Sequence, residues 1–160
     1  MKANLAILAS VALAACSPQP SAQATPAAEA STSARHPVSG LAVVPITVSS
    51  GKRTHRFMVE VAATAAEQAK GLMFRTAMGA NEGMIFPGEP AQVRSFWMRN
   101  TVIPLDIIYI GPDRRVVNIV QGKPYDETPL PSAGPVVNVL ELNAGRSAEL
   151  GIEPGDLVSW

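Results

Sequence analysis

Leu105–Ile110 reads LDIIYI and Val136–Leu142 reads VVNVLEL, and these two stretches decide the fold class. Each is short, rich in β-branched and aliphatic residues, and bounded by turn-forming residues, which is typical of β-strands. Side chains alternate between the two faces of a strand, and both faces of each stretch are apolar. The sequence therefore predicts strands that are apolar on both sides, with isolated polar residues among them.

Similar short strands are predicted on either side of these two. Their ranges are Val43–Val48, Phe57–Val61, Met84–Phe86, Val93–Met98, Val116–Val120 and Leu157–Trp160. Pro45 favours a sheet edge for the first of them, because proline cannot donate to the ladder. About seven or eight short strands in one chain predict a mainly β fold, either a compact single-domain barrel or a sandwich.

One helix is predicted from about Ala65 to Phe74, and a second from about Ala144 to Leu150. Thr64 and Glu67 have the capping-box spacing, in which each side chain satisfies a free backbone N–H at the start of a helix. The face of the first helix that is expected to lie across the sheet consists of Ala65, Ala69, Leu72 and Met73.

Composition restricts the classes of function. The chain has 160 residues, 13 Lys plus Arg and 13 Asp plus Glu, and therefore no net charge with neutral histidines. This length fits one globular domain at most. Without a basic cluster, no nucleic-acid partner is expected. No stretch approaches the roughly 18 to 20 apolar residues of a membrane-spanning helix.

Residues 1–15 are predicted to be a lipoprotein signal peptide. Lys2 precedes the mostly apolar run Leu5–Ala15, and Leu13-Ala14-Ala15-Cys16 resembles the lipobox of bacterial lipoprotein precursors. Cys16, the only cysteine of the chain, is expected to carry acyl chains that bind a membrane. Ser17 stands where aspartate is the usual inner-membrane retention signal, so by resemblance a periplasmic protein on the outer membrane is expected.

Residues 16–40 are predicted to form the lipidated cysteine and a flexible tether. Ser17–Gly40 contains six Ala, five Ser and four Pro, a composition that cannot bury enough apolar surface to order the backbone. The β domain is accordingly predicted to span residues 41–160.

Polar residues inside the apolar strands indicate where a site should be sought. Asp106, Asn138 and Glu141 all interrupt apolar faces. An unpaired buried carboxylate is costly, so each acid needs a cation or backbone donors nearby, or a strand end that faces water. The candidate cationic partners are Arg75, Arg94, Arg99 and Arg146.

The segment Phe96–Thr101, FWMRNT, is the densest mixture of aromatic and polar groups and runs directly towards Asp106. We expect a pocket there. The predicted pocket or polar cluster consists of Arg75, Trp97, Arg99, Asn100, Thr101, Asp106, Asn138, Glu141 and Asp156.

Several motifs in this order resemble the bacterial and archaeal family 192 of the domains of unknown function. They are Gly71-Leu72-Met73 with Arg75, Gly83-Met84-Ile85-Phe86, FWMRNT with Ile103-Pro104-Leu105-Asp106-Ile107, Val139-Leu140-Glu141-Leu142 with Gly145, and Gly155-Asp156. The resemblance covers about Phe57 to Val158 and implies a compact, mostly β fold. It brings no established activity and therefore no catalytic residue.

Four interpretations of the polar and sulfur-bearing residues stay open. One interpretation is structural, with ion pairs that tie the strands together. Another is a pocket for a small molecule or glycan, with Trp97 as a flat apolar face. A hydrolase would use Asp106 and Glu141 about 5 to 10 Å apart. Thioethers could hold cuprous copper, the candidates being Met73, Met78, Met84 and Met98. Binding or scaffolding without catalysis or a cofactor is the expected role.

Overall fold

The computed structural model describes residues 34–160. The predicted signal peptide, Cys16 and most of the predicted tether lie outside the described residues. In chain order the elements are β1 Val43–Ser50, β2 Arg53–Val61, α1 Ala65–Lys70, β3 Glu82–Gln92, β4 Ser95–Phe96, β5 Leu105–Ile110, β6 Val116–Gly122, β7 Leu130–Pro131, β8 Val136–Asn143, α2 Arg146–Leu150 and β9 Leu157–Ser159. The prediction of a mainly β fold with two short helices is confirmed. Neither helix is long and apolar enough to cross a membrane.

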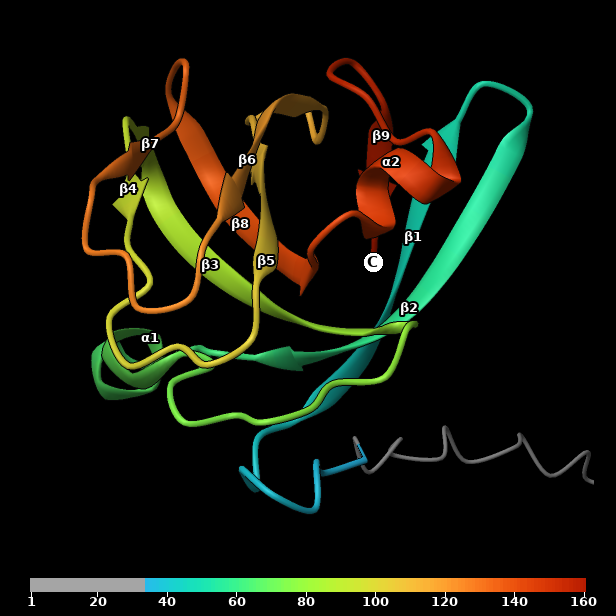
Figure 1. Ribbon diagram of the computed structural model, residues 1–160. Helices are drawn as coiled ribbons and strands as arrows, with labels where there is room; N and C mark the ends of the chain where they lie inside the picture. The colour runs from blue at the N-terminus through green and yellow to red at the C-terminus, as the bar shows by residue number, and fades with distance from the viewer. Residues whose placement is uncertain (1–33) are drawn as a thin grey trace, which may run out of the picture. The chain divides into compact units, whose positions relative to one another are not determined.

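Seven strands form one curled sheet in the order β6-β5-β8-β3-β2-β1-β9, and β4 pairs separately with β7 (Figure 1). Only β2 and β3 are parallel, and α1 lies in the connection between them. The two edges of the large sheet approach each other, because Arg115 forms a bridge with Leu157 and the Val116 N–H donates to the Asp156 carbonyl at 2.9 Å. The curl therefore brings the two edge strands together, as in a barrel.

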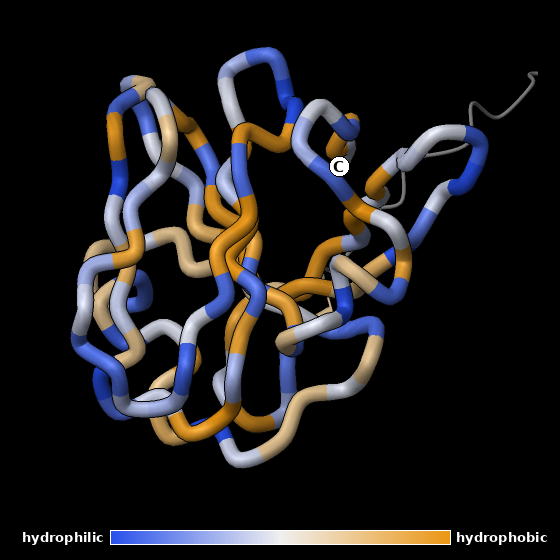
Figure 2. The backbone as a smooth tube through the Cα atoms, turned by 45° about the horizontal axis from the view of Figure 1, so that its top comes forward, coloured by the Kyte–Doolittle hydropathy of each residue, from blue (hydrophilic) through white to orange (hydrophobic). Residues whose placement is uncertain are grey.

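Both faces of the central strands β5 and β8 are buried, as their apolar faces predict. One face carries a core that includes Phe57, Ile108 and Leu140. The other carries a second core that includes Phe86 and Tyr109. In Figure 2 the apolar parts of the chain follow the central strands and the hydrophilic parts follow the outer loops. Two cores on one sheet explain why these strands cannot show the simple apolar–polar alternation of a half-exposed sheet.

The first helix begins where the sequence predicts and ends earlier. Thr64 accepts from the Glu67 N–H while the Glu67 side chain accepts from the Thr64 N–H, so the capping box forms. The helix stops at Lys70, because Gly71 adopts a positive φ of 47°. The prediction that Ala65 and Ala69 face the core is wrong: no residue of α1 is buried, and Leu72 enters the core only after the helix has ended.

Two other segments differ from the expected boundaries. β3 continues to Gln92, well past the predicted end at Phe86, and the predicted strand Val93–Met98 shrinks to Ser95–Phe96. Pro45 lies on β1 beyond the stretch that pairs with β9. The backbone N–H that proline lacks is therefore not needed for a hydrogen bond to β9. Residues 34–42 fold back on themselves through a bridge between Arg35 and Ala42, and the Val61 N–H of β2 donates to the Ala42 carbonyl at 2.9 Å.

Candidate functional site

The two acids of the central strands lie on opposite faces of the sheet. Asp106 on β5 stands directly opposite Leu142 on β8, so their side chains share one face. Leu142 belongs to the first core, and its neighbour Glu141 points to the other face. The hydrolase interpretation, which requires the two carboxylates to flank one cleft, is therefore wrong.

Asp106 is satisfied within the protein and holds α2 in place. Its two oxygens accept from the backbone N–H groups of Gly145 at 3.0 Å and Ser147 at 2.9 Å. Gln121 on the neighbouring strand β6 adds a longer contact at 3.4 Å. The predicted need for backbone donors is thus met at the start of a helix, where free N–H groups are available. This carboxylate has a structural role.

Glu141 is buried without a partner. The residue is 4% exposed, and within residues 34–160 no group hydrogen-bonds its side-chain oxygens or forms an ion pair with them. Burial alone raises the pKa of the Glu141 carboxyl to about 8, because the charged form loses its hydration. The backbone of β3 passes so close to β8 here that position 83 requires glycine: a Cβ on Gly83 would lie 2.5 Å from the Glu141 carbonyl oxygen.

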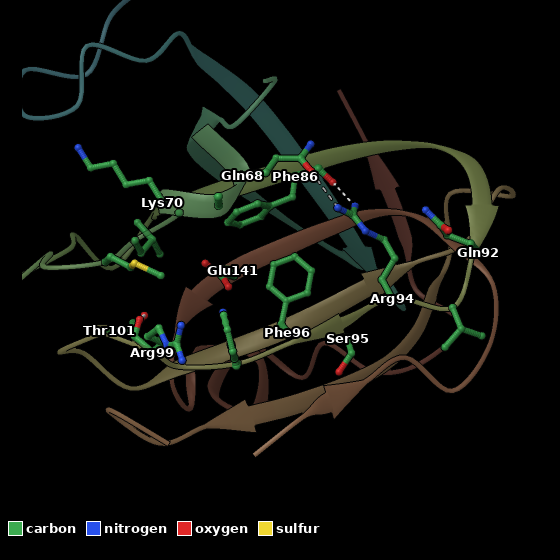
Figure 3. A pocket seen from close by; sticks show the side chains of 16 residues that line it. Gln68, Lys70, Phe86, Gln92, Arg94, Ser95, Phe96, Arg99, Thr101 and Glu141 are labelled. Atoms are coloured by element: carbon green, nitrogen blue, oxygen red, sulfur yellow. Dashed lines mark hydrogen bonds between the residues drawn. The ribbon is translucent and has the colours of Figure 1, made fainter. Parts of the chain in front are cut away.

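Glu141 faces an open pocket of about 460 Å³, which we call the Glu141 pocket. It lies between the end of α1, the segment that carries β4 and the second face of the sheet (Figure 3). Its lining residues are Gln68, Ala69, Lys70, Gly71, Leu72, Met73, Phe86, Gln92, Val93, Arg94, Ser95, Phe96, Trp97, Arg99, Thr101 and Glu141. A volume of this size fits a small organic molecule.

Aromatic rings form the apolar part of the pocket. Phe86 and Phe96 meet edge to face with ring centroids 5.0 Å apart, and Phe96 meets Tyr109 behind it at 6.1 Å. The Tyr109 hydroxyl donates to the Leu130 carbonyl, and burial first of all raises the pKa of this hydroxyl to about 12. Tyr109 is therefore a fixed, neutral support for Phe96.

Two arginines with different surroundings line the pocket. Arg94 donates to the Phe86 carbonyl at 3.0 Å and to the Gln68 side-chain oxygen at 3.1 Å, while burial lowers the pKa of its guanidinium. Arg99 instead forms a two-pronged ion pair with Glu127, at 3.1 and 2.8 Å, and lies 4.2 Å from the centre of the Trp97 ring. The charge of Arg99 is compensated, and that of Arg94 is not.

The other predicted site residues are distributed over several places. The pocket brings together Trp97, Arg99, Thr101 and Glu141, whereas Arg75, Asp106, Asn138 and Asp156 do not line it. Asn100 has a positive φ of 53° and donates to the Met73 sulfur at 3.9 Å. Asp156 accepts from the Glu153 N–H in the turn before β9. Sequence reasoning missed Gln68, Phe86, Arg94 and Phe96 as pocket residues; Phe96 was within reach, since FWMRNT marks the segment.

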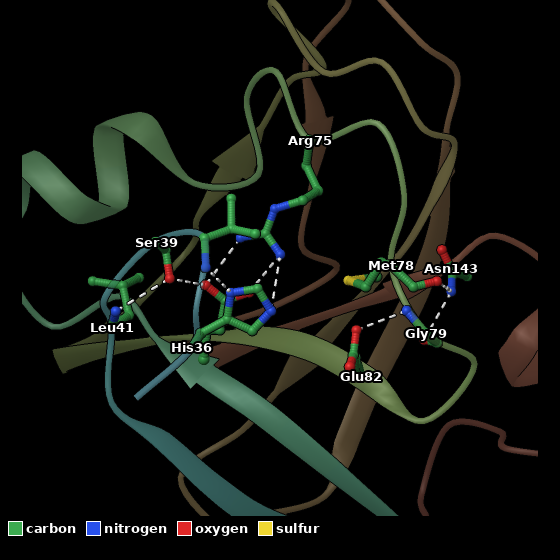
Figure 4. A network of polar contacts seen from close by, with 10 residues as sticks. His36, Ser39, Leu41, Arg75, Met78, Gly79, Glu82 and Asn143 are labelled. Atoms are coloured by element: carbon green, nitrogen blue, oxygen red, sulfur yellow. Dashed lines mark hydrogen bonds and ion pairs between the residues drawn. The ribbon is translucent and has the colours of Figure 1, made fainter. Parts of the chain in front are cut away.

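Arg75 belongs to a second polar network around Glu60 on β2 (Figure 4). Its guanidinium contacts the two Glu60 oxygens at 2.8 and 3.0 Å. His36 lies 3.6 Å from the same carboxylate, and the Ser39 hydroxyl donates to it. We call these four residues the Glu60 network. It ties the start of the described chain to β2 and to the loop after α1.

The copper candidates mostly fill the second core. Met84 and Met98 are buried there, and Met78 packs against them. Met73 lines the Glu141 pocket. In residues 34–160 no group of three or more His, Cys, Asp or Glu side chains is placed to hold a metal ion. Packing accounts for the positions of Met78, Met84 and Met98.

Comparison with known proteins identifies a protein family and solved structures of relatives. The family model DUF192, "Uncharacterized ACR", matches residues 46–160. A crystal structure of a protein of unknown function from Novosphingobium aromaticivorans is 60% identical with a TM-score of 0.78, covering 86% of this chain and 99% of that one. A Sinorhizobium meliloti protein, provisionally described as a transcription regulator, is 35% identical with a TM-score of 0.72, covering 74% and 94%. No curated protein matches significantly.

Proposed function

The chain belongs to the DUF192 family, and from that premise we propose that its β domain is a binding module that holds a small organic ligand in the Glu141 pocket. The observation that carries the proposal is the carboxyl group of Glu141, a residue that is 4% exposed: this group has no partner among the described residues and faces an open cavity. Buried polar groups are almost always hydrogen-bonded in folded proteins. A ligand that hydrogen-bonds to Glu141 would supply the missing partner.

The lining of the pocket supports binding of an organic molecule. Apolar aromatic walls combined with a few directed polar groups are the usual composition of small-molecule sites. Phe86, Phe96 and Trp97 provide such walls, and Thr101 and Glu141 provide the polar groups. The transcription-regulator description belongs to the Sinorhizobium meliloti relative. In this chain the numbers of acidic and basic residues are equal, which gives no electrostatic basis for binding nucleic acid.

The proposal includes a place for the module, at a membrane surface of the cell envelope. It rests on the lipobox-like Leu13–Cys16 and on the Ser17–Gly40 composition. We expect Cys16→Ser to move the protein from the membrane to the soluble fraction of fractionated cells, because the acyl chains would be its membrane contact. Ser17→Ala keeps the cysteine and serves as the control. Membrane association that persists in Cys16→Ser would rule the anchor out.

Filling the pocket should abolish binding. Ala69 lies on the exposed side of α1 and lines the pocket, so Ala69→Trp would place an indole in the cavity without disturbing a core. Ala65 is exposed on the same helix and does not line the pocket, which makes Ala65→Trp a matched control. We expect single-ring fragments, detected by saturation-transfer NMR with the purified full chain, to bind the wild type and Ala65→Trp and not Ala69→Trp.

The fragment experiment has two outcomes that would contradict the proposal. Fragments that bind all three proteins equally, or that bind none of the three, would contradict the proposed site.

A raised carboxyl pKa next to a pocket is also what a general acid requires, which favours an acid–base enzyme as the second candidate. Mass spectrometry of the bound compounds would then show a product with the wild type and none with Glu141→Gln.

A further inference from the structure

We infer that the Glu141 pocket selects a small organic anion, an aromatic or aliphatic body that carries a carboxylate or a similar acidic group. This inference rests on the proposed binding function and specifies the class of ligand. It follows from the balance of charges around the pocket, from the protonation of Glu141 and from the shape of the aromatic wall.

The charges that line the pocket are predominantly positive. Lys70, Arg94 and Arg99 line it, and of these only Arg99 has a carboxylate partner, Glu127, within 4 Å among the described residues. Arg94 is half-buried, and the two atoms that accept hydrogen bonds from its guanidinium are neutral oxygens. Guanidinium stays charged even where burial lowers its pKa. A ligand anion would compensate this charge, whereas a ligand cation would add to it.

Glu141 is compatible with an anion because it is mostly neutral at pH 7. Burial holds the pKa of its carboxyl at about 8, and no cation of the described chain lowers it. A neutral carboxyl can donate its O–H to a ligand oxygen, and donation to an anionic acceptor is among the stronger hydrogen bonds. Within residues 34–160 no group forms a hydrogen bond with the Glu141 carboxyl, so this donor is available to a ligand.

The body of the ligand would lie against the rings. Phe86 and Phe96 meet at nearly a right angle, 84°, which forms a corner between Glu141 and Arg94 (Figure 3). Trp97 is kept in place by the Arg99 guanidinium 4.2 Å from its ring centre. A flat or branched apolar group can pack into such a corner and leave its acidic group to the polar ends of the pocket.

Charge-matched probes test the inference. We propose to titrate the purified full chain with phenylacetate, its neutral amide phenylacetamide and the cation 2-phenylethylamine, at about pH 6 and about pH 9, on either side of the Glu141 pKa. Phenylacetate should bind tightest at the lower pH. Its affinity should fall about tenfold at the higher pH, because ionised Glu141 then repels it.

Three variants assign the effect to residues. Glu141→Gln should keep phenylacetate binding at the lower pH and lose the fall in affinity at the higher pH, because its amide still donates and cannot ionise. Arg94→Gln should weaken phenylacetate about tenfold while changing phenylacetamide little. Arg94→Lys keeps the charge and should restore most of the preference for the anion, which also controls for damage to the fold.

Each other result overturns the inference in a recognisable way. Tightest binding of 2-phenylethylamine, growing stronger with pH, would assign a cation to the pocket and leave the proposed binding function standing. Equal binding of phenylacetate and phenylacetamide would remove the charge selection. Failure of all three probes at millimolar concentration would also overturn the anion inference, whereas the binding function itself fails only if no fragment distinguishes Ala69→Trp from Ala65→Trp.

Discussion

Replacing Arg75 by methionine is expected to lower the free energy of unfolding by about 3 kcal/mol, because it leaves the Glu60 carboxylate buried without its main cation. Both side chains are shielded from water, Arg75 at 10% exposure and Glu60 at 4%. The two oxygens of Glu60 each meet one guanidinium nitrogen, at 2.8 and 3.0 Å. Methionine preserves the apolar stem and removes only the charged donors.

Chemical denaturation of the wild type and of Arg75→Met measures this loss. The double variant Glu60→Gln/Arg75→Met should recover part of it, since no buried charge is then left uncompensated. Arg99→Met provides a matched control, because the pair Arg99–Glu127 has similar geometry but is about half exposed, at 47% and 51%, and exposed pairs contribute little. A loss in Arg99→Met as large as that in Arg75→Met would show that burial of the pair is not what matters.

The Glu60 network also positions one wall of the Glu141 pocket. Arg75 directly follows the turn Gly71–Phe74, whose first three residues line the pocket. The Phe74 N–H donates to the Asn100 carbonyl at 2.8 Å, which joins this turn to the segment that carries Trp97 and Arg99. Loss of the ion pair would therefore loosen the pocket as well as the fold. Arg75, predicted as a site residue, lies outside the pocket and is paired with Glu60.

The sheet could be predicted because its signal is local. In Leu105–Ile110 and Val136–Leu142 the alternation of side chains, read from a few neighbouring residues, fixes which ones share a face. The same alternation identified Asp106 and Glu141 as embedded acids, and both are buried. The capping box at Thr64 is local too, since its two members are three residues apart. Such patterns are independent of the rest of the chain.

The partners of these acids could not be predicted, because they depend on contacts between distant segments. Asp106 is satisfied by amides about 40 residues away, at Gly145 and Ser147. Arg75, a candidate partner for the strand acids, pairs with Glu60 instead. Alanine side chains are too small to dictate which face of a short helix is buried, so Ala65 and Ala69 gave a false pattern. That Glu141 lacks a partner is visible only in three dimensions.

Replacing Glu141 by glutamine is expected to stabilise the protein near neutral pH, by on the order of 3 kcal/mol. The pKa of this carboxyl is about 8 in the folded protein, against an ordinary value of about 4.3 in the unfolded chain. Between these values the folded state holds a proton that the unfolded state has released. The free energy of unfolding of the wild type must then fall as pH rises, by at most about 1.4 kcal/mol per pH unit.

Glutamine cannot ionise, so the difference between Glu141→Gln and the wild type should be near its minimum below about pH 4.5, grow until about pH 8, and then level off. Chemical denaturation of both proteins across this range gives that difference directly. Glu127→Gln is the control with the opposite sign, because the hydrogen bond from Arg99 holds the pKa of Glu127 below its usual range. A difference that stays constant with pH would mean that Glu141 is hydrated or paired in solution.

A positive result would connect stability with binding at one residue. An acid that lowers the stability of the native state at neutral pH, while a glutamine of the same shape does not, gives the fold no advantage. Its value must then lie in what the ionisable group does at the pocket surface. The same Glu141→Gln variant that gains stability should lose the dependence of phenylacetate affinity on pH. The stability difference should level off near the pH at which phenylacetate affinity for the wild type begins to fall, about pH 8, because both report ionisation of Glu141 in the folded protein.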